Sequence, residues 1–276
     1  MKTILRSTLT IMLSLVLALG FSACESTTDD DDTGTLSVTM TDAPFPTDLV
    51  AEANVTITEL EAREKDVEDT HSPFLTLSDS TQTFNLLDLR NGVTTSLANL
   101  DVPVGTYDMF RLYVSAGEII LKDGTTYNLT VPSGAQTGIQ LLVSPAIEVV
   151  GGLTADLLLD FDVEKSFVPK GPRTDLTGFN FKPVIRAVNA SVVGSLAGRV
   201  TDALDVGLGD ARVWVSQDTV FSTTYTDTTT GEYTILGLDP GSYTASATLE
   251  GYDTLSVEIE IVVGNETTRD FELTPQ

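Results

Sequence analysis

The sequence has few of the residues that support most enzyme and nucleic-acid chemistry. It holds one cysteine and one histidine among 276 residues, so it cannot form an internal disulfide or a metal site with two histidines. Lysine and arginine number 15 against 40 acidic residues, which gives a formal net charge of -25. Such a surface excludes general nucleic-acid binding, because that affinity depends on basic side chains that neutralise phosphates. It also argues against adsorption to anionic lipids through basic patches.

The only long apolar run lies near the start, at residues 11–19, behind two basic residues. It is shorter than the roughly 20 residues that span a bilayer, and it fits the apolar region of a secretory signal peptide. Ser22 and Ala23, both small, then precede Cys24. This arrangement resembles the lipobox of bacterial lipoproteins, with Phe21 where leucine is commoner. The alternative is an ordinary signal peptide with a chance cysteine near its end.

The lipobox resemblance implies cleavage after residue 23, a diacylglycerol on Cys24 and acylation of the new amino terminus. Two or three acyl chains hold a protein stably on a membrane, whereas a single chain does not. The resemblance therefore implies a membrane partner and a place in the bacterial cell envelope, at the outer membrane. Residues 24–33 are polar and acidic, so we expect the lipidated Cys24 to be followed by a disordered tether. The tether is either a solvated spacer or an acidic signal that resembles the one directing Bacteroidetes-type lipoproteins to the cell surface.

The rest of the chain predicts an all-β fold. Apolar and polar residues alternate over residues 36–40 and 53–58 and in several later runs, which places one side of each strand on a core. Turn residues such as Asp123-Gly124 separate the runs, and many short strands between turns are typical of β-sandwiches. Helical signals are weak: residues 84–90 fit a single turn, and the charged residues 59–69 predict a loop or a hairpin tip.

Composition and turn spacing divide the mature chain into two β-sandwich domains, residues 34–190 and 195–276. The second resembles the carboxypeptidase regulatory-like domain, a transthyretin-like (prealbumin-like) sandwich grouped with carbohydrate-binding-like folds. The resemblance rests on motifs in the family order: Gly198-x-Val200, Ala211-x-Val213-x-Val215, Gly231-x-Tyr233 and Pro240-Gly241-x-Tyr243. The grouping is one of shape and does not establish sugar binding.

The first domain resembles a bacterial family of unknown function, catalogued as number four-three-eight-two. The matching segments include Thr41-Asp42-Ala43-Pro44, Asp160-Phe161-Asp162 and Lys182-Pro183-Val184-Ile185-Arg186. This resemblance implies a β-rich secreted lipoprotein domain and no particular activity.

One turn motif occurs in both domains. Residues 100–107 and 238–243 each place an aspartate, a proline, a glycine and then a tyrosine that opens a strand. Either the first domain also contains a transthyretin-like sandwich, or turns before strands converge on the same residues.

The motifs of common catalysts are missing, so we predict a protein that is not an enzyme and needs no cofactor. The lone histidine, His71, has neither the glutamate nor the second histidine of a zinc carboxypeptidase. No Gly-x-Ser-x-Gly elbow accompanies it, and no phosphate- or dinucleotide-binding loop occurs. Asp160, Asp162 and Glu164 are spaced by two and are expected to share one strand face. They are either a solvated face or weak candidates for Ca²⁺, since calcium-loop spacing is absent.

Trp214 is the clearest candidate for ligand binding. Val213 and Val215 are expected to face the core, which turns Trp214 outward beside Arg212. An exposed indole can stack on a sugar ring, whereas a Trp packed against the first domain or a covering loop would be structural.

The leading hypothesis is a non-enzymatic, lipid-anchored envelope or surface protein that acts as a structural or binding module, with another envelope protein as a possible partner. The alternative is a carbohydrate-binding accessory lipoprotein with a glycan partner. A carboxylate-dependent hydrolase is the third and least favoured reading.

Overall fold

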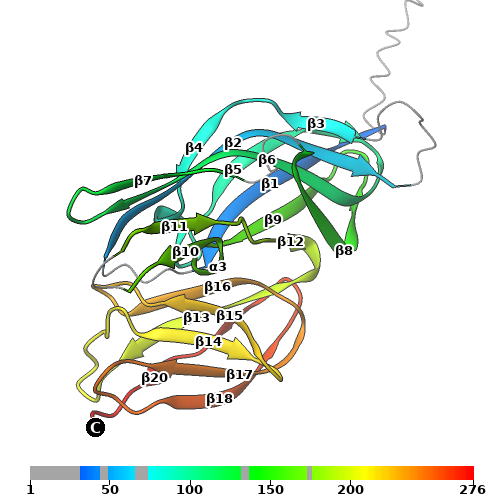
Figure 1. The fold of residues 1–276 in the computed structure, drawn as a ribbon. Coiled ribbons are helices and arrows are strands. Elements are labelled where there is room, and N and C mark those ends of the chain that lie inside the picture. Colours follow the sequence, from blue (N-terminus) through cyan, green and yellow to red (C-terminus); the bar gives the residue numbers. More distant parts are fainter. Residues whose placement is uncertain (1–31, 44–48, 66–73, 132–136, 173–175) are drawn as a thin grey trace, which may run out of the picture. The chain divides into compact units, whose positions relative to one another are not determined.

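Strands make up nearly all of the regular structure in a computed structural model of the chain (Figure 1). The structure describes residues 32–43, 49–65, 74–131, 137–172 and 176–276. Residues 31–276 form one unit by backbone contacts. Within this unit, buried hydrophobic side chains form two large clusters, one drawn from residues 36–187 and one from residues 196–273. The prediction of an all-β chain with two β-sandwich domains is confirmed. The predicted signal peptide, Cys24, most of the tether and His71 lie outside the described residues.

Two main sheets build the first domain. One has the strand order β12-β9-β1-β5, and the other has the order β3-β2-β6-β7, with β4 also on β2 and β8 also on β6. A hairpin of β10 and β11 is added to them. The elements are β1 (Thr33–Ala43), β2 (Val50–Glu64), β3 (Phe74–Ser78), β4 (Gln82–Asn85), η1 (Leu86–Leu89), β5 (Thr95–Pro103), β6 (Gly105–Leu121), β7 (Thr126–Leu129), β8 (Ile139–Val149), β9 (Thr154–Asp162), α3 (Val163–Ser166), β10 (Phe167–Lys170), β11 (Gly178–Phe181), β12 (Ile185–Asn189) and η2 (Ala190–Val192).

Strand β9 is buried on both faces. It pairs in parallel with β1 and antiparallel with β12, and its Leu157, Leu158 and Leu159 are all buried. Leu157 and Leu159 join the first core, whereas Leu158 joins a small third cluster that also contains Leu236 from the second domain. A continuous apolar run is typical of a strand covered on both sides. Strand β9 therefore links the first core to the junction between the domains.

Strand β2 shows where the sequence was misleading. We predicted a loop or hairpin tip over residues 59–69, but β2 continues to Glu64 and pairs with β6 as far as Tyr107. Leu60 and Ala62 alternate with charged residues and are buried, so residues 59–64 form a two-faced strand rather than a solvated loop, whereas residues 66–69 lie outside the described residues. The single helical turn predicted at residues 84–90 is confirmed as η1, capped by the Asn85 side chain.

The second domain has two four-stranded sheets. The first has the order β16-β13-β19, with β20 also on β13, and the second has the order β15-β14-β17-β18. Their strands are β13 (Gly194–Thr201), β14 (Arg212–Ser216), β15 (Val220–Tyr225), β16 (Glu232–Leu238), β17 (Gly241–Thr248), β18 (Leu255–Ile261), β19 (Glu266–Thr268) and β20 (Phe271–Glu272). Large fully buried side chains, including Tyr233, Tyr243 and Phe271, fill the space between the sheets.

The tyrosine of the repeated turn motif makes a similar hydrogen bond in both domains. The buried Tyr107 donates its hydroxyl hydrogen to the carbonyl oxygen of Pro103 at 3.0 Å, and the buried Tyr243 donates to that of Asp239, also at 3.0 Å. In each case the acceptor lies four residues before the tyrosine, across a turn that opens a strand. Burial, followed by the nearby Glu64 charge, raises the pKa of Tyr107 to about 12. Each tyrosine thus fixes the entry to a core strand while its ring fills the core.

Candidate functional site: the cleft around Arg186

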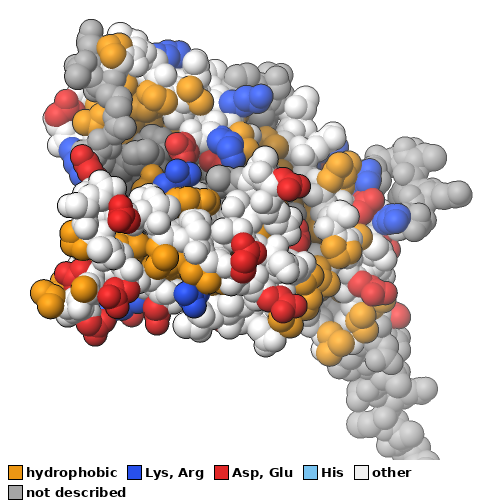
Figure 2. All heavy atoms as spheres, turned by 90° about the horizontal axis from the view of Figure 1, so that it is seen from below, with side chains coloured by type: hydrophobic (Ala, Val, Ile, Leu, Met, Phe, Trp, Pro, Cys, Tyr) orange, Lys and Arg blue, Asp and Glu red, His pale blue; other side chains and the backbone are white. Residues whose placement is uncertain are grey.

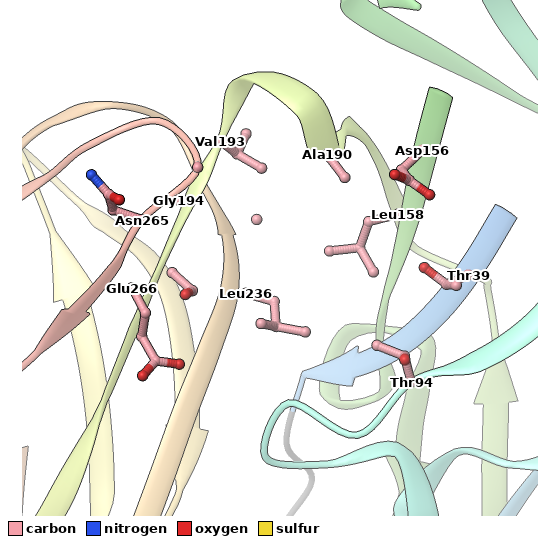
Figure 3. Close-up of a pocket in the computed structure, with 13 residues that line it drawn as sticks. Thr39, Thr94, Asp156, Leu158, Ala190, Val193, Gly194, Leu236, Asn265 and Glu266 are labelled. Atoms are coloured by element: carbon pink, nitrogen blue, oxygen red, sulfur yellow. The ribbon is translucent and has the colours of Figure 1, made fainter. Parts of the chain in front are cut away.

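A small hydrophobic cluster joins the two domains. Leu158, Val188 and Val193 are buried together, with Ala190 and Leu236 packed against them. All of these except Val188 line a groove of about 430 Å³, into which Leu158 of β9 and Leu236 of β16 extend their side chains from opposite sides (Figure 3). Residues 189–195, which connect the two domains, contain helix η2 and the start of β13 and contribute Val193 to this cluster. The contact is apolar and lies between parts that each have their own core.

A loop of the first domain also binds the edge strand β16. The Asn91 side-chain amide donates to the Glu232 carbonyl oxygen at 3.1 Å, and its oxygen accepts from the Thr234 amide at 2.6 Å. Asn91 has a φ of 60° and Gly92 a φ of 78°. A Cβ on Gly92 would lie 2.7 Å from the Thr234 side chain, so glycine is needed there both for its backbone angle and for space. The two hydrogen bonds from Asn91 pair the Glu232 carbonyl and the Thr234 amide, which lie on the otherwise open edge of β16.

Arg186 of β12 is the central polar residue of the junction. Its guanidinium donates to the Gly237 carbonyl oxygen in the second domain at 2.8 Å and to the Asp160 carboxylate at 3.1 Å. The guanidinium carbon also lies 5.1 Å from the ring centre of Phe221, within cation–π range. The Arg186 side chain therefore neutralises the Asp160 carboxylate within the first domain. It also contacts β16 of the second domain at Gly237 and β15 at Phe221.

Arg186 forms part of a cleft of about 450 Å³ with walls from both domains. The cleft holds both positive and negative side chains, together with one aromatic ring and small hydroxyl groups. Its polar and aromatic lining consists of Asp160, Asp162, Glu164, Lys165, Arg186, Arg212, Phe221, Ser222 and Thr223. Phe221 is exposed, and the buried hydroxyl of Thr223 has no hydrogen-bond partner among the described residues. Such a lining offers hydrogen-bond donors and acceptors beside an apolar surface.

The three predicted carboxylates do line one cleft, but they do not share a strand face. Asp160 and Asp162 lie on β9, whereas Glu164 lies on α3, because the Asp162 side chain caps that helix at the Lys165 amide. The prediction for Glu164 is therefore wrong. Asp160 is paired with Arg186, and Asp162 with the Lys165 ammonium at 2.7 Å. Nowhere in the described part of the chain do three His, Cys, Asp or Glu residues come together in a metal-holding arrangement.

Trp214 lies where its strand pattern placed it. Val213 and Val215 are fully buried, and Trp214 is half-buried on the opposite face of β14, between Thr223 of β15 and Ser246 of β17. The Arg212 guanidinium carbon lies 5.2 Å from the Trp214 ring centre. Of the two candidates, Arg212 lines the cleft, and Trp214 lies two residues further along the same strand, opposite the cleft residue Thr223.

A buried acid, Asp42, was missed as a site residue. It lies on β1 opposite Phe161 of β9, is 6% exposed, and neither carboxylate oxygen completes a hydrogen bond to a described residue. Burial, followed by the charge of Asp160, raises the pKa of Asp42 well above its ordinary value, although the Val163 amide opposes this rise. The same burial effect raises the pKa of Asp160, with Arg186 opposing it.

No sequence signal singled out Asp42, Arg186, Phe221 or Asn91. Asp42 and Arg186 fell inside segments quoted for the family resemblance, but neither segment showed what these side chains contact. None of the helices in the described ranges has the length and apolar character needed to cross a bilayer.

Two family models match the chain. One, described as a domain of unknown function (DUF4382), covers residues 33–183, and the other, a carboxypeptidase regulatory-like domain, covers residues 195–274. The chain belongs to the DUF4382 family. Both domain-family resemblances drawn from the sequence, and their order along the chain, are confirmed. The cleft around Arg186 therefore has one wall from the DUF4382 domain and one from the carboxypeptidase regulatory-like domain.

No curated protein matches the chain. Among solved structures, the Bacillus anthracis TIE protein is 13% identical, with a TM-score of 0.28, and the match covers 88% of this chain and 51% of that one. The chain thus spans about half the length of that protein. The minor pilin GBS52 of Streptococcus agalactiae is 14% identical with a TM-score of 0.26, over 87% and 96% of the two chains. The shaft pilin SpaA of Lactobacillus rhamnosus GG is 12% identical with a TM-score of 0.26, over 88% and 98%.

Proposed function

We propose that this chain is a non-enzymatic, lipid-anchored protein of the bacterial cell envelope, held at the outer membrane through Cys24 and exposed at the cell surface. Its two sandwich domains act as a spacer that presents a binding cleft. The observation that supports this most is the junction, where the hydrophobic cluster, Asn91 and Arg186 fasten one domain to the other. A hydrophobic contact reinforced by hydrogen bonds limits relative motion, which suits a structural module.

The negative charge of the chain and its β-sandwich fold both suit the proposed structural role at the cell surface. In Figure 2, acidic side chains are dispersed among hydrophobic and uncharged ones, and Lys and Arg are fewer. A strongly negative chain stays soluble and repels other anionic surfaces. β-Sandwiches close their backbone hydrogen bonds within sheets and leave the loops free to vary, so they tolerate exposure outside the cell.

The anchor is tested by replacing Cys24 in the full-length chain. Cys24→Ala removes the only thiol, so the protein is expected to leave the membrane fraction and to lack the mass of the acyl groups. Fractionation on a density gradient and intact-mass measurement check both expectations, and protease added to intact cells checks surface exposure. Ser26→Ala, two residues away, is the matched control and is expected to stay membrane-bound. A Cys24→Ala protein that stays membrane-bound with unchanged mobility would show that the anchor is wrong.

A second candidate function is glycan binding at the cleft, favoured by the aromatic ring of Phe221 beside Arg186 and Arg212, with Trp214 next to them. Sugars bind through stacking on aromatic faces and through hydrogen bonds to charged and hydroxyl side chains. This candidate differs from the first in predicting a soluble small-molecule ligand.

Residues 34–276 placed on a glycan array test the second candidate. If glycans bind, Phe221→Ala and Trp214→Ala are expected to weaken binding about tenfold, the effect of losing one stacked ring. Trp214→Phe, which keeps a flat ring, is expected to retain most of the affinity. Unchanged binding in both alanine variants would end the sugar proposal at this cleft, and turnover in a parallel hydrolase screen would favour an enzyme instead.

A further inference from the structure

Three exposed aliphatic side chains lie in two turns at one end of the first domain. Val104 occupies the turn between β5 and β6, and Val150 and Leu153 occupy the turn between β8 and β9. Their side chains are 41%, 47% and 61% exposed. Turns are ordinarily polar because they lie in water, so aliphatic residues at the tips of adjacent turns mark a contact surface.

Both turns are fastened to the start of β1. The Val104 amide donates to the Asp32 carbonyl oxygen at 3.0 Å, and the Thr35 amide donates to the Leu153 carbonyl oxygen at 2.9 Å. Strand β1 pairs with β5 on one side and with β9 on the other, so it enters the fold between the two turns. A Cβ on Gly34 would collide with the backbone of Val150, which shows how closely this turn packs on β1. The three aliphatic side chains therefore surround the point where the chain enters the domain.

We infer that Val104, Val150 and Leu153 form a docking surface for the lipid bilayer in which the acyl chains on Cys24 are inserted. This inference rests on the proposed lipidation. Asp32 is the eighth residue after Cys24, and such a length of chain spans at most roughly 28 Å. The end of the domain where β1 begins is thus the end nearest the membrane. A short tether gives this surface a high effective concentration at the bilayer, so modest apolar burial is enough to hold it there.

Acidic side chains near the start of β1 are expected to favour a bilayer with zwitterionic headgroups. Asp32 is exposed at the entry, and the exposed Asp101 lies on β5 two residues before Pro103, beside Thr35. These carboxylates repel anionic headgroups and are tolerated by zwitterionic ones. The surface is therefore expected to dock on phosphatidylcholine-like lipid more readily than on phosphatidylglycerol-like lipid.

A fluorescent reporter on the surface tests the inference. Cys24 carries lipid in the anchored protein, so a thiol introduced by Val150→Cys is the only one available for labelling. The full-length lipidated protein is labelled with an environment-sensitive dye and reconstituted into phosphatidylcholine vesicles that carry nitroxide lipids. Emission from the dye is expected to shift to the blue and to be quenched about twofold or more. The same dye attached through Leu204→Cys, at a residue of the second domain that is 84% exposed, is expected to show neither change.

The outcomes separate the docking surface from the anchor. Failure of the protein to float with vesicles would contradict the lipidation of Cys24. Flotation without a shift or quenching at position 150 would overturn the docking surface and leave the anchor intact. A shift that appears without vesicles and grows with protein concentration would assign the surface to self-association and also overturn the inference. Adding Val104→Glu and Leu153→Glu to the Val150→Cys protein is expected to abolish the shift while flotation and melting temperature stay unchanged.

Discussion

Arg186→Ala is expected to destabilise the protein by about 2–4 kcal/mol. The change removes the counter-charge of Asp160, whose side chain is 15% exposed, and leaves the Gly237 carbonyl oxygen without its donor. Breaking a buried ion pair from one side costs more than the pair itself contributes, because the remaining charge stays desolvated. Denaturant unfolding of residues 34–276 measures the loss. Arg212→Ala is the matched control, since it removes an exposed arginine from the same cleft and is expected to cost no more than about 0.5 kcal/mol.

The loss from Arg186→Ala is expected to depend on pH. Burial already raises the pKa of Asp160, and Arg186 opposes that rise, so removing the arginine raises the pKa of Asp160 further. The folded variant then holds a proton that the unfolded chain releases at lower pH, so its stability falls as pH increases through this range. The deficit should therefore be larger at pH 8 than at pH 5. Adding Asp160→Asn removes the stranded charge and is expected to recover about half of the loss. An equal deficit at both pH values would contradict this explanation.

Asp42→Asn is expected to stabilise the protein by about 1–3 kcal/mol at pH 8, an unusual sign for a substitution in a core. The buried carboxylate has no completed hydrogen bond among the described residues and lies close to two other acids, Asp160 and Asp162. Asparagine has nearly the same shape without the charge. Asp88→Asn is the control, because Asp88 is exposed on helix η1 and its replacement is expected to change stability little.

The gain from Asp42→Asn is also expected to vary with pH. Because burial raises the pKa of Asp42, the folded wild-type chain keeps the proton at pH values where the unfolded chain has lost it. Wild-type stability therefore falls as pH rises from the ordinary carboxyl value of 3.8 through the raised pKa, and the variant does not share this fall. The two proteins should be nearly equal near pH 4 and furthest apart at pH 8. A destabilised variant at pH 8 would show that the carboxylate has a partner and is needed in the native state.

Asp42 and Arg186 show which contacts could not be predicted from the sequence. Asp42 and Arg186 both fell in segments quoted for the family resemblance, although the family model itself ends at residue 183, and the sequence gives no distance between the end of β1 and strand β12. Strand β9 lies between them and pairs with both, which brings Asp42 near Asp160 and Asp160 within 3.1 Å of Arg186. Glu164 shows the opposite error, because a pattern of every second residue was extended past Asp162, where a local helix cap ends the strand.

The sequence alone determined many of the strands and the strand face of Trp214, because alternation of apolar and polar residues and turn chemistry are local properties. It also pointed to the two families through the order of their motifs. It also predicted the paired tyrosine turns, although only the structure showed that each hydroxyl binds the carbonyl oxygen four residues before it. The cleft, the buried acid and the aliphatic turn tips were decided by tertiary structure. Each depends on which strands lie side by side, and that choice is made by contacts between residues far apart in the chain.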